Sequence, residues 1–227
     1  MDKFLSLLQF SDGLFPAGAY AHSFGLESCV QSGEVRDAAG VEAFLRDYLE
    51  GCAAPTDAVA LLCAKRAAVS EDIASCLALD ERLDAMKTPS ELRDASRQMG
   101  RQTLRVATHL TCHPLLEEFR KAVDDEITPG HHAIVFGMIG GMFEWNTLEM
   151  VSALLYSTSA ALVGASLRLL PLGQLAGQRI LWNVNSLIVA LAEETQNKTE
   201  QDMWSFAPAL EIASMTHAML DARLFRS

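Results

Sequence analysis

The stretch that settles the fold class lies at residues 88–114 and reads TPSELRDASRQMGRQTLRVATHLTCHP. Its start combines a capping Thr88, a proline at the first helical position and Glu91 in the first turn. These signals predict a helix that runs to about Leu110 and stops before Pro114. Alternating runs of Val and Ile, which are typical of strands, are rare along the chain, and Ala and Leu dominate it. The pattern favours an all-α protein.

Length and composition predict one domain with a substantial core. The chain has 227 residues, of which 50% are hydrophobic and 21% are charged. No linker divides it and no segment of 20–50 residues repeats, so residues 1–227 are expected to form a single helical bundle. At the usual helix length of about 11–12 residues, the chain has room for roughly eight to ten helices.

Helix-breaking and capping residues indicate where the other helices begin and end. Thr128-Pro129-Gly130 breaks the chain, Asn146 can cap the helix that follows, and Pro171 precedes a helix that continues to about Glu194. A last helix is expected over residues 209–221. Charge is sparse in the second half, which has 8 acids and 5 bases after residue 126 against 21 and 13 before it. Its nearly apolar segments are therefore expected in the middle of the bundle; they are residues 133–143, 150–167 and 180–192.

The charge balance and the cysteines exclude several protein classes. A formal net charge of −11 argues against binding to nucleic acid or to an anionic membrane surface. The first residues lack the features of a signal peptide, and the serine-containing stretch 150–167 fits a buried helix better than a membrane span. Five cysteines without a CxxC pair indicate reduced thiols. We therefore expect a cytoplasmic protein.

Catalytic motifs are absent, and one group of residues has metal-ligand spacing. The phosphate-loop, GxSxG, HExxH and zinc-ribbon patterns do not occur. His109, Cys112 and His113 lie three and four residues apart and can form a nickel or zinc site on one helix face. The alternative is a helix end where histidines lie near the last carbonyl groups.

Three other stretches carry unusual sets of residues. In the first, a loop with Pro16 and Gly18 leads into a segment in which Tyr20, Ser23 and Glu27 are expected to share one helix face. They can cap a helix, pair across a core or bind a partner.

The second stretch is residues 167–179. Gly173 and Gly177 lie four apart and would allow another helix to approach closely, flanked by Gln174 and Gln178. Arg168 is isolated among apolar residues, so it must pair with an acid or reach a surface.

The third stretch is the segment Arg223-Leu224-Phe225-Arg226-Ser227, in which cations alternate with large apolar residues. Residues 222–227 are expected to form a flexible docking tail, because Arg and aromatic side chains are favoured at interfaces. A frayed helix end with cations near its dipole is the alternative.

Taken in order, these stretches resemble the urease accessory protein F family. The residues that carry the resemblance span nearly the entire chain. They are Pro16, Gly18, Ser23, Gly25-Leu26-Glu27, Gln98-Met99-Gly100-Arg101, Arg168, Pro171-Leu172-Gly173-Gln174, Gly177-Gln178-Arg179, Ser205-Phe206-Ala207-Pro208, Ile212-Ala213-Ser214, His217 and residues 223–227.

The resemblance implies an all-α homodimer without catalytic residues or a tightly bound cofactor. Such proteins join a second accessory protein (D, or H in some species) and the nickel-carrying GTPase (protein G), and the assembly delivers nickel to apo-urease. By this resemblance, His217, Arg223, Leu224, Phe225, Arg226 and Ser227 bind protein D/H, and Arg168, Gln174, Gln178 and Arg179 bind the GTPase. The loop with Pro16, Gly18, Tyr20, Ser23 and Glu27 lies near the dimer or its nickel route.

One segment departs from the family pattern, and other functions stay open. The family commonly has an acid and then Tyr-Ser before the arginine, whereas this chain has Ala218-Met219-Leu220-Asp221-Ala222. A nickel-binding metallochaperone that uses His109, Cys112 and His113 is the main alternative, and a helical enzyme with an unrecognised site is another. An arginine-finger role for Arg168 or Arg179 on the GTPase is a further possibility.

Overall fold

The helix expected between Pro89 and Pro114 is present as α6 (Ser90–Thr111) in the computed structural model, which describes residues 2–227. Pro89 itself occupies the capping position and Glu91 lies in the first turn, so the helix begins two residues after Thr88. Cys112 ends it in the left-handed conformation, with φ of 48°. Local signals therefore located both ends of this helix.

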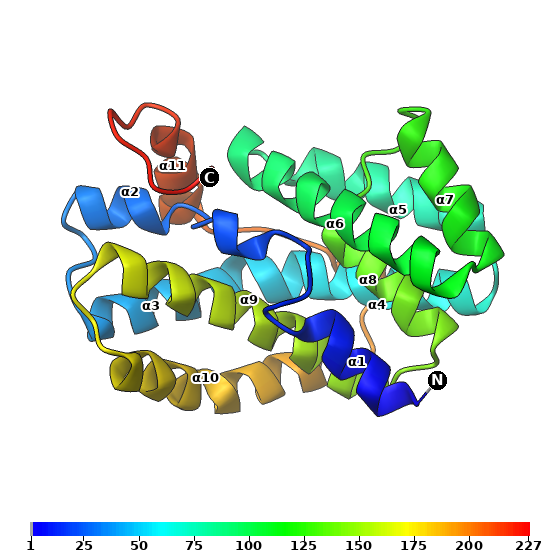
Figure 1. The fold of residues 1–227 in the computed structure, drawn as a ribbon, viewed down its shortest axis with the longest axis horizontal. Helices are drawn as coiled ribbons and strands as arrows, with labels where there is room; N and C mark the ends of the chain where they lie inside the picture. The colour runs from blue at the N-terminus through cyan, green and yellow to red at the C-terminus, as the bar shows by residue number, and fades with distance from the viewer. Residues whose placement is uncertain (1) are drawn as a thin grey trace.

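The described residues hold ten separate helices and no strand, which confirms the predicted all-α class (Figure 1). In this count α3 and α4 form one helix, because the π-helical segment η2 joins them without a break. The bounds are α1 (Lys3–Ser11), η1 (Ala19–Ala21), α2 (Leu26–Gln31), α3 (Ala38–Tyr48), η2 (Leu49–Ala58), α4 (Val59–Val69), α5 (Ile73–Met86), α6 (Ser90–Thr111), α7 (Pro114–Asp124), α8 (His132–Met142), α9 (Thr147–Leu169), α10 (Gln174–Thr195), η3 (Glu200–Asp202) and α11 (Pro208–His217).

The helices form two groups around a central layer. In Figure 1, α5, α6 and α7 lie at one end, and α2, α3 and α11 lie at the other, where the chain also ends. The helix α8 packs against the central α4, α9 contacts the segment η2 that precedes α4, and α10 runs alongside α9. Helix α11 thus returns to pack beside α2, which begins at Leu26.

The π-helical segment η2 arises where Pro55 interrupts a continuous helix. Proline has no N–H, so it cannot donate to the carbonyl of Gly51 four residues earlier. That carbonyl instead accepts a hydrogen bond from the Phe206 amide at 2.9 Å. The Trp204 amide donates to the Pro55 carbonyl at 3.3 Å. A proline in the helix interior therefore creates the attachment site for the segment that leads into α11.

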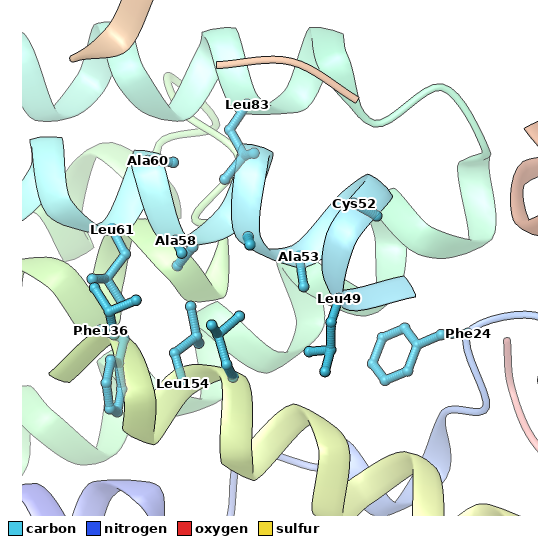
Figure 2. Close-up of a cluster of buried hydrophobic side chains, with 14 of the residues drawn as sticks. Phe24, Leu49, Cys52, Ala53, Ala58, Ala60, Leu61, Leu83, Phe136 and Leu154 are labelled. Carbon is cyan, nitrogen blue, oxygen red and sulfur yellow. The ribbon is translucent and has the colours of Figure 1, made fainter. Parts of the chain in front are cut away.

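The core follows the axis of η2 and α4. Figure 2 shows Leu61 of this axis beside Phe136 of α8, and Leu49 beside Phe24. Helix α8 is buried almost all round, as its apolar composition predicts. It crosses α4 so closely that a Cβ on Gly137 would lie 2.3 Å from the carbonyl oxygen of Leu61.

The placement of the other two apolar segments differs from the prediction. Helix α9 buries only half of its apolar window, although it is the one helix in residues 2–227 long and apolar enough to pass a membrane-span test. Helix α10 is peripheral, and its outer face exposes Leu175, Trp182 and Val189. The prediction that a segment with few charges is buried is wrong for α10. Its exposed apolar residues recur every seven positions, so they lie on one face of the helix, and that face points outward.

A buried carboxylate fixes the turn that starts α8. Asp80 of α5 accepts hydrogen bonds from the Thr128 hydroxyl at 2.7 Å and from the amides of Gly130 and His131 at 2.6 and 2.8 Å. This turn packs directly on α6, where a Cβ on Gly100 would lie 2.0 Å from the Gly130 carbonyl oxygen. Only glycine fits at position 100.

Candidate functional site

The Glu27 side chain is the central acceptor of a buried site between α2, α11 and the last residues of the chain. Its two oxygens accept hydrogen bonds from the amides of Leu224 at 2.7 Å and Phe225 at 3.0 Å. One of them also lies 2.9 Å from Nε2 of His217. Burial opposes ionisation, but these hydrogen bonds outweigh it and hold the pKa of Glu27 below its usual value.

His217 lies between two carboxylates. While its Nε2 faces Glu27, its Nδ1 lies 2.6 Å from a carboxylate oxygen of Glu91 on α6. The ring itself is completely buried. The Nε2–Glu27 contact has hydrogen-bond geometry, whereas the Nδ1–Glu91 contact is a close approach without it. The three residues thus connect α2, α6 and α11.

The residues before Glu27 hold the far end of the same segment. The Ser23 hydroxyl donates to the carbonyl of Ser227 at 2.7 Å, and the Arg226 amide donates to the Ala21 carbonyl at 2.8 Å. Nδ1 of His22 lies 2.8 Å from the Ser227 hydroxyl. Burial, aided by the charge of Arg226, lowers the pKa of His22 to about 4, so this ring is neutral at pH 7.

Arg168 links the residues around Tyr20 to the final segment of the chain. Its guanidinium lies 4.3 Å from the centre of the Phe225 ring and donates to the Tyr20 carbonyl at 3.0 Å. Arg168 therefore satisfies its charge by a cation–π contact and a carbonyl rather than by an acid. The three stretches that the sequence singled out meet here: residues 20–27, the end of α9, and residues 217–227.

The end of the final segment packs against the rest of the chain, and the flexibility expected for residues 222–227 stays a prediction. Phe225 and Ser227 are buried, and the hydrogen bonds above fix the backbone from Leu224 to Ser227. Composition alone does not reveal the buried carboxylate of Glu27, 197 positions earlier, that accepts a hydrogen bond from the Leu224 amide. Arg223, Leu224 and Arg226 point to the surface.

The prediction that Tyr20, Ser23 and Glu27 share one helix face is wrong. Tyr20 lies in the short η1 and exposes its side chain, whereas α2 begins only at Leu26, after Gly25 with φ of 90°. Ser23 and Glu27 do act together, since both hold the final segment. Pro16 and Gly18 lie in the preceding exposed loop, where the positive φ of Gly18 turns the chain into η1.

Comparison with known proteins gives the family. The sequence profile of the UreF family matches residues 35–185. The chain is 30% identical to the urease accessory protein UreF of Bacillus sp. (strain TB-90) over 227 residues, which cover both proteins in full. It is 33% identical to the urease accessory protein UreF of Actinobacillus pleuropneumoniae over 230 residues, again with full coverage of both. The chain belongs to the UreF family. It is a urease accessory protein involved in urease maturation.

Apart from Arg168, the residues that the family resemblance assigns to the GTPase lie outside this site, on α10. Gln174, Gln178 and Arg179 are exposed in the first turns of α10. Only Gly177 makes the close approach expected of a glycine pair: a Cβ there would lie 3.0 Å from the Val163 side chain. Gly173 has open space around it because it precedes the helix. The glutamines therefore face outward and do not flank a helix contact.

The structure does not support the metal site at His109, Cys112 and His113. Cys112 adopts the left-handed conformation that ends α6, and His113 caps α7, so the three residues do not share a helix face. Nowhere in residues 2–227 do three or more His, Cys, Asp or Glu side chains form a group that could hold a metal ion. Sequence spacing failed here because Pro114 redirects the chain.

Sequence reasoning missed two features of the UreF-family site. Glu91 was treated only as a helix-start signal, and no local pattern shows that it reaches His217. The second feature is a set of exposed apolar side chains on α11 and in the segments on either side of it, which we call the α11 face. A spacing of three and four residues along α11 could have revealed part of it. The α11 face consists of Phe206, Ile212, Met215, Met219 and Leu224, all exposed.

Proposed function

We propose that this UreF-family chain is a non-catalytic maturation factor that bridges protein D/H and the nickel-carrying GTPase, and so promotes nickel insertion into apo-urease. The observation that carries the proposal is the ordered segment 217–227, which presents charged and apolar side chains beside the α11 face. Nickel is the cargo of the complex, and this chain needs no tightly bound cofactor. Its place of action is the cytoplasm, in keeping with its reduced cysteines.

The D/H partner binds the final segment and the α11 face. Exposed apolar side chains gathered in one area mark protein interfaces, and arginine is favoured there. Arg223, Leu224 and Arg226 meet this description without any rearrangement. His217, Phe225 and Ser227 are buried within the chain and support the surface from below.

The GTPase binds the start of α10 and the neighbouring end of α9. Gln174, Gln178 and Arg179 supply polar contacts on α10, and Leu175 and Trp182 on the same helix supply exposed apolar area. Arg168 contacts both Tyr20 and Phe225, so a partner on α10 lies close to the final segment. This arrangement supports an adaptor that responds to two partners at once.

A second copy of the chain binds the exposed apolar face at the N-terminal end. Phe4, Leu5 and Leu8 of α1 are each at least half exposed, and Leu14 in the next loop is almost fully exposed. A homodimer through this face also brings together two copies of the loop with Pro16 and Gly18. The loop is thereby next to the dimer and its nickel route.

The direct test is complex formation in solution. The chain, protein D/H and the GTPase are mixed and resolved by gel filtration with light scattering. Leu224→Arg should weaken the complex with D/H at least tenfold, because burying an unpaired charge at an interface costs about 2–5 kcal/mol. Leu110→Arg is the matched control, since Leu110 on α6 is 54% exposed and Leu224 is 53% exposed.

The same mixtures separate the two partner surfaces. Trp182→Ala should reduce recruitment of the GTPase while leaving the D/H complex intact, since buried Trp residues commonly dominate interface energies. If Leu224→Arg and Leu110→Arg bind D/H equally well, the proposed D/H surface is incorrect. If the three proteins never associate, or the chain alone turns over a substrate, the adaptor function itself is refuted.

A further inference from the structure

A hollow of about 430 Å³ opens on the side of the molecule where α4 ends and α9 begins. Two apolar residues of α4, Leu62 and Val69, line part of it. Its polar lining comes from Lys65 and Arg66 of α4, from Ser70 just after α4, from Thr147, and from Gln196 and Asn197 after α10. We call it the α4–α9 hollow. Its volume lies within the range of small-ligand sites. None of the residues that the sequence or the family comparison singled out lines it.

The two cations of this hollow are held in place by neutral acceptors. Nζ of Lys65 donates to the carbonyl of Trp145 and to the Thr147 hydroxyl at 2.8 Å. The Arg66 guanidinium donates to the carbonyls of Lys198 at 2.6 Å and Gln196 at 2.9 Å. These contacts fix the geometry of both side chains but leave their positive charges uncompensated. Each side chain also retains further N–H donors.

No acid lines the hollow, which is unusual in a chain with a net charge of −11. Burial and repulsion from Arg66 lower the pKa of Lys65, as expected where two cations share a site without a counter-charge. A second hollow, of about 670 Å³ beside α6 and α7, makes the contrast clear. Its four arginines are accompanied by three acids, and two of those arginines form ion pairs.

The remaining hydrogen-bond donors of the α4–α9 hollow, like its two cations, favour a negatively charged ligand. Thr147 is the first residue of the 23-residue α9, and only the Glu149 amide of that first turn is capped by Asn146. The amide of Thr147, which lines the hollow, is therefore free of a helical partner, at the positive end of the helix dipole. Ser70, Gln196 and Asn197 add hydroxyl and amide donors.

We propose that the α4–α9 hollow is a binding site for a small oxyanion, a phosphate or a carboxylate, held by Lys65, Arg66 and the first turn of α9. Two fixed cations and a helix N-terminus are a recurrent arrangement for binding these groups. The site is separate from the surfaces assigned to protein partners, so it adds a small-molecule ligand to an adaptor.

The experiment is a titration of the isotope-labelled full-length chain, followed by NMR amide shifts. The probes are inorganic phosphate in one arm and malonate in the other, with ionic strength held constant by chloride. We expect saturable shifts at Ser70, Thr147, Leu148 and Asn197, with a dissociation constant on the order of 1 mM. The probe with the lower dissociation constant shows whether phosphate or carboxylate is the preferred group.

Variants of the chain test whether the NMR amide shifts arise from binding in the α4–α9 hollow. Arg66→Gln removes an exposed cation and should weaken binding about tenfold, the effect of one charge-assisted hydrogen bond. Lys65→Met should do the same. Arg105→Gln, an exposed arginine of the second hollow, should bind as the wild type does. The proposal is overturned if neither probe saturates, if chloride alone produces the same shifts, or if Arg66→Gln and Arg105→Gln behave alike.

Discussion

Replacing Glu27 by Gln tests whether one buried carboxylate holds the end of the chain in place. The substitution keeps the shape of the side chain and removes its charge. It also replaces one acceptor oxygen by an NH₂ donor. That donor then faces the Leu224 amide, or else the Phe225 amide and His217, which are themselves donors. His217 loses one of the two carboxylates that flank it.

The size of the effect follows from these three contacts. A hydrogen bond to a charged group contributes about 1.5–3 kcal/mol, and breaking one partner of a buried ion pair costs about 3–5 kcal/mol. Gln retains one oxygen and part of the bonding, so we expect the segment from His217 to Ser227 to lose about 3 kcal/mol. Because the lost contacts all hold this segment, the effect appears first as local opening of its backbone.

Hydrogen exchange measures that opening residue by residue. A loss of about 3 kcal/mol corresponds to roughly 100-fold faster exchange of the Leu224 and Phe225 amides. Urea denaturation measures the free energy of unfolding of the whole domain, which is the upper limit for the free energy of local opening. Glu118→Gln is the matched control, since Glu118 is exposed on α7 and its side chain forms no hydrogen bond or ion pair with any of residues 2–227.

Acidification provides an independent version of the same test. The pKa of Glu27 is lower in the folded chain than its ordinary value of 4.5. Its stabilising effect is therefore complete above pH 4.5 and is lost as the pH falls through the folded pKa. Unchanged exchange at Leu224 and Phe225 in Glu27→Gln, at pH 7, would refute the assignment of Glu27 as the anchor.

Two further predictions concern packing and buried histidines. Gly100→Ala should lower the free energy of unfolding by at least about 3 kcal/mol, measured by urea denaturation, because its Cβ would lie 2.0 Å from the Gly130 carbonyl oxygen. Gly164→Ala, which meets nothing within 4 Å inside α9, should instead stabilise by about 0.5–1 kcal/mol, and equal losses in both variants would contradict the packing account. Burial lowers the pKa values of His22 and His132 to about 4, so stability should be complete above pH 6.5 and fall as the pH drops toward 4. His22→Asn should make the dependence of unfolding free energy on pH shallower over that window, and an unchanged dependence would count against a buried neutral His22.

Local sequence signals predicted helices well where each signal acts within a few residues. Asn146 caps α9 through the Glu149 amide, as its position predicted, and α10 ends at Thr195, one residue beyond the expected end. The last helix was placed less well: α11 ends at His217 rather than at residue 221. His217 turns inward to meet Glu27 and Glu91, and this tertiary demand overrides the helical tendency of the residues that follow.

The site was predicted in its parts and not in its geometry. The sequence singled out Glu27, Arg168 and residues 223–227 because each stretch was unusual in itself. It did not show that Arg168 would lie against Phe225, or that Glu27 would bind the final segment rather than share a helix face with Tyr20. Those contacts depend on how α2, α9 and α11 pack, which no spacing of residues reveals.

Composition, periodicity and helix-boundary residues by themselves determined that this chain is all helical and where most of its helices begin. These properties depend on interactions between residues a few positions apart, such as caps, proline breaks and apolar repeats. Tertiary structure alone decided the rest: the burial of Glu27 against a partner 190 positions away, and the meeting of Lys65 and Arg66 with the start of α9. Such contacts form only when helices distant in sequence pack together, because a buried charge is stable only where the whole fold supplies its partners.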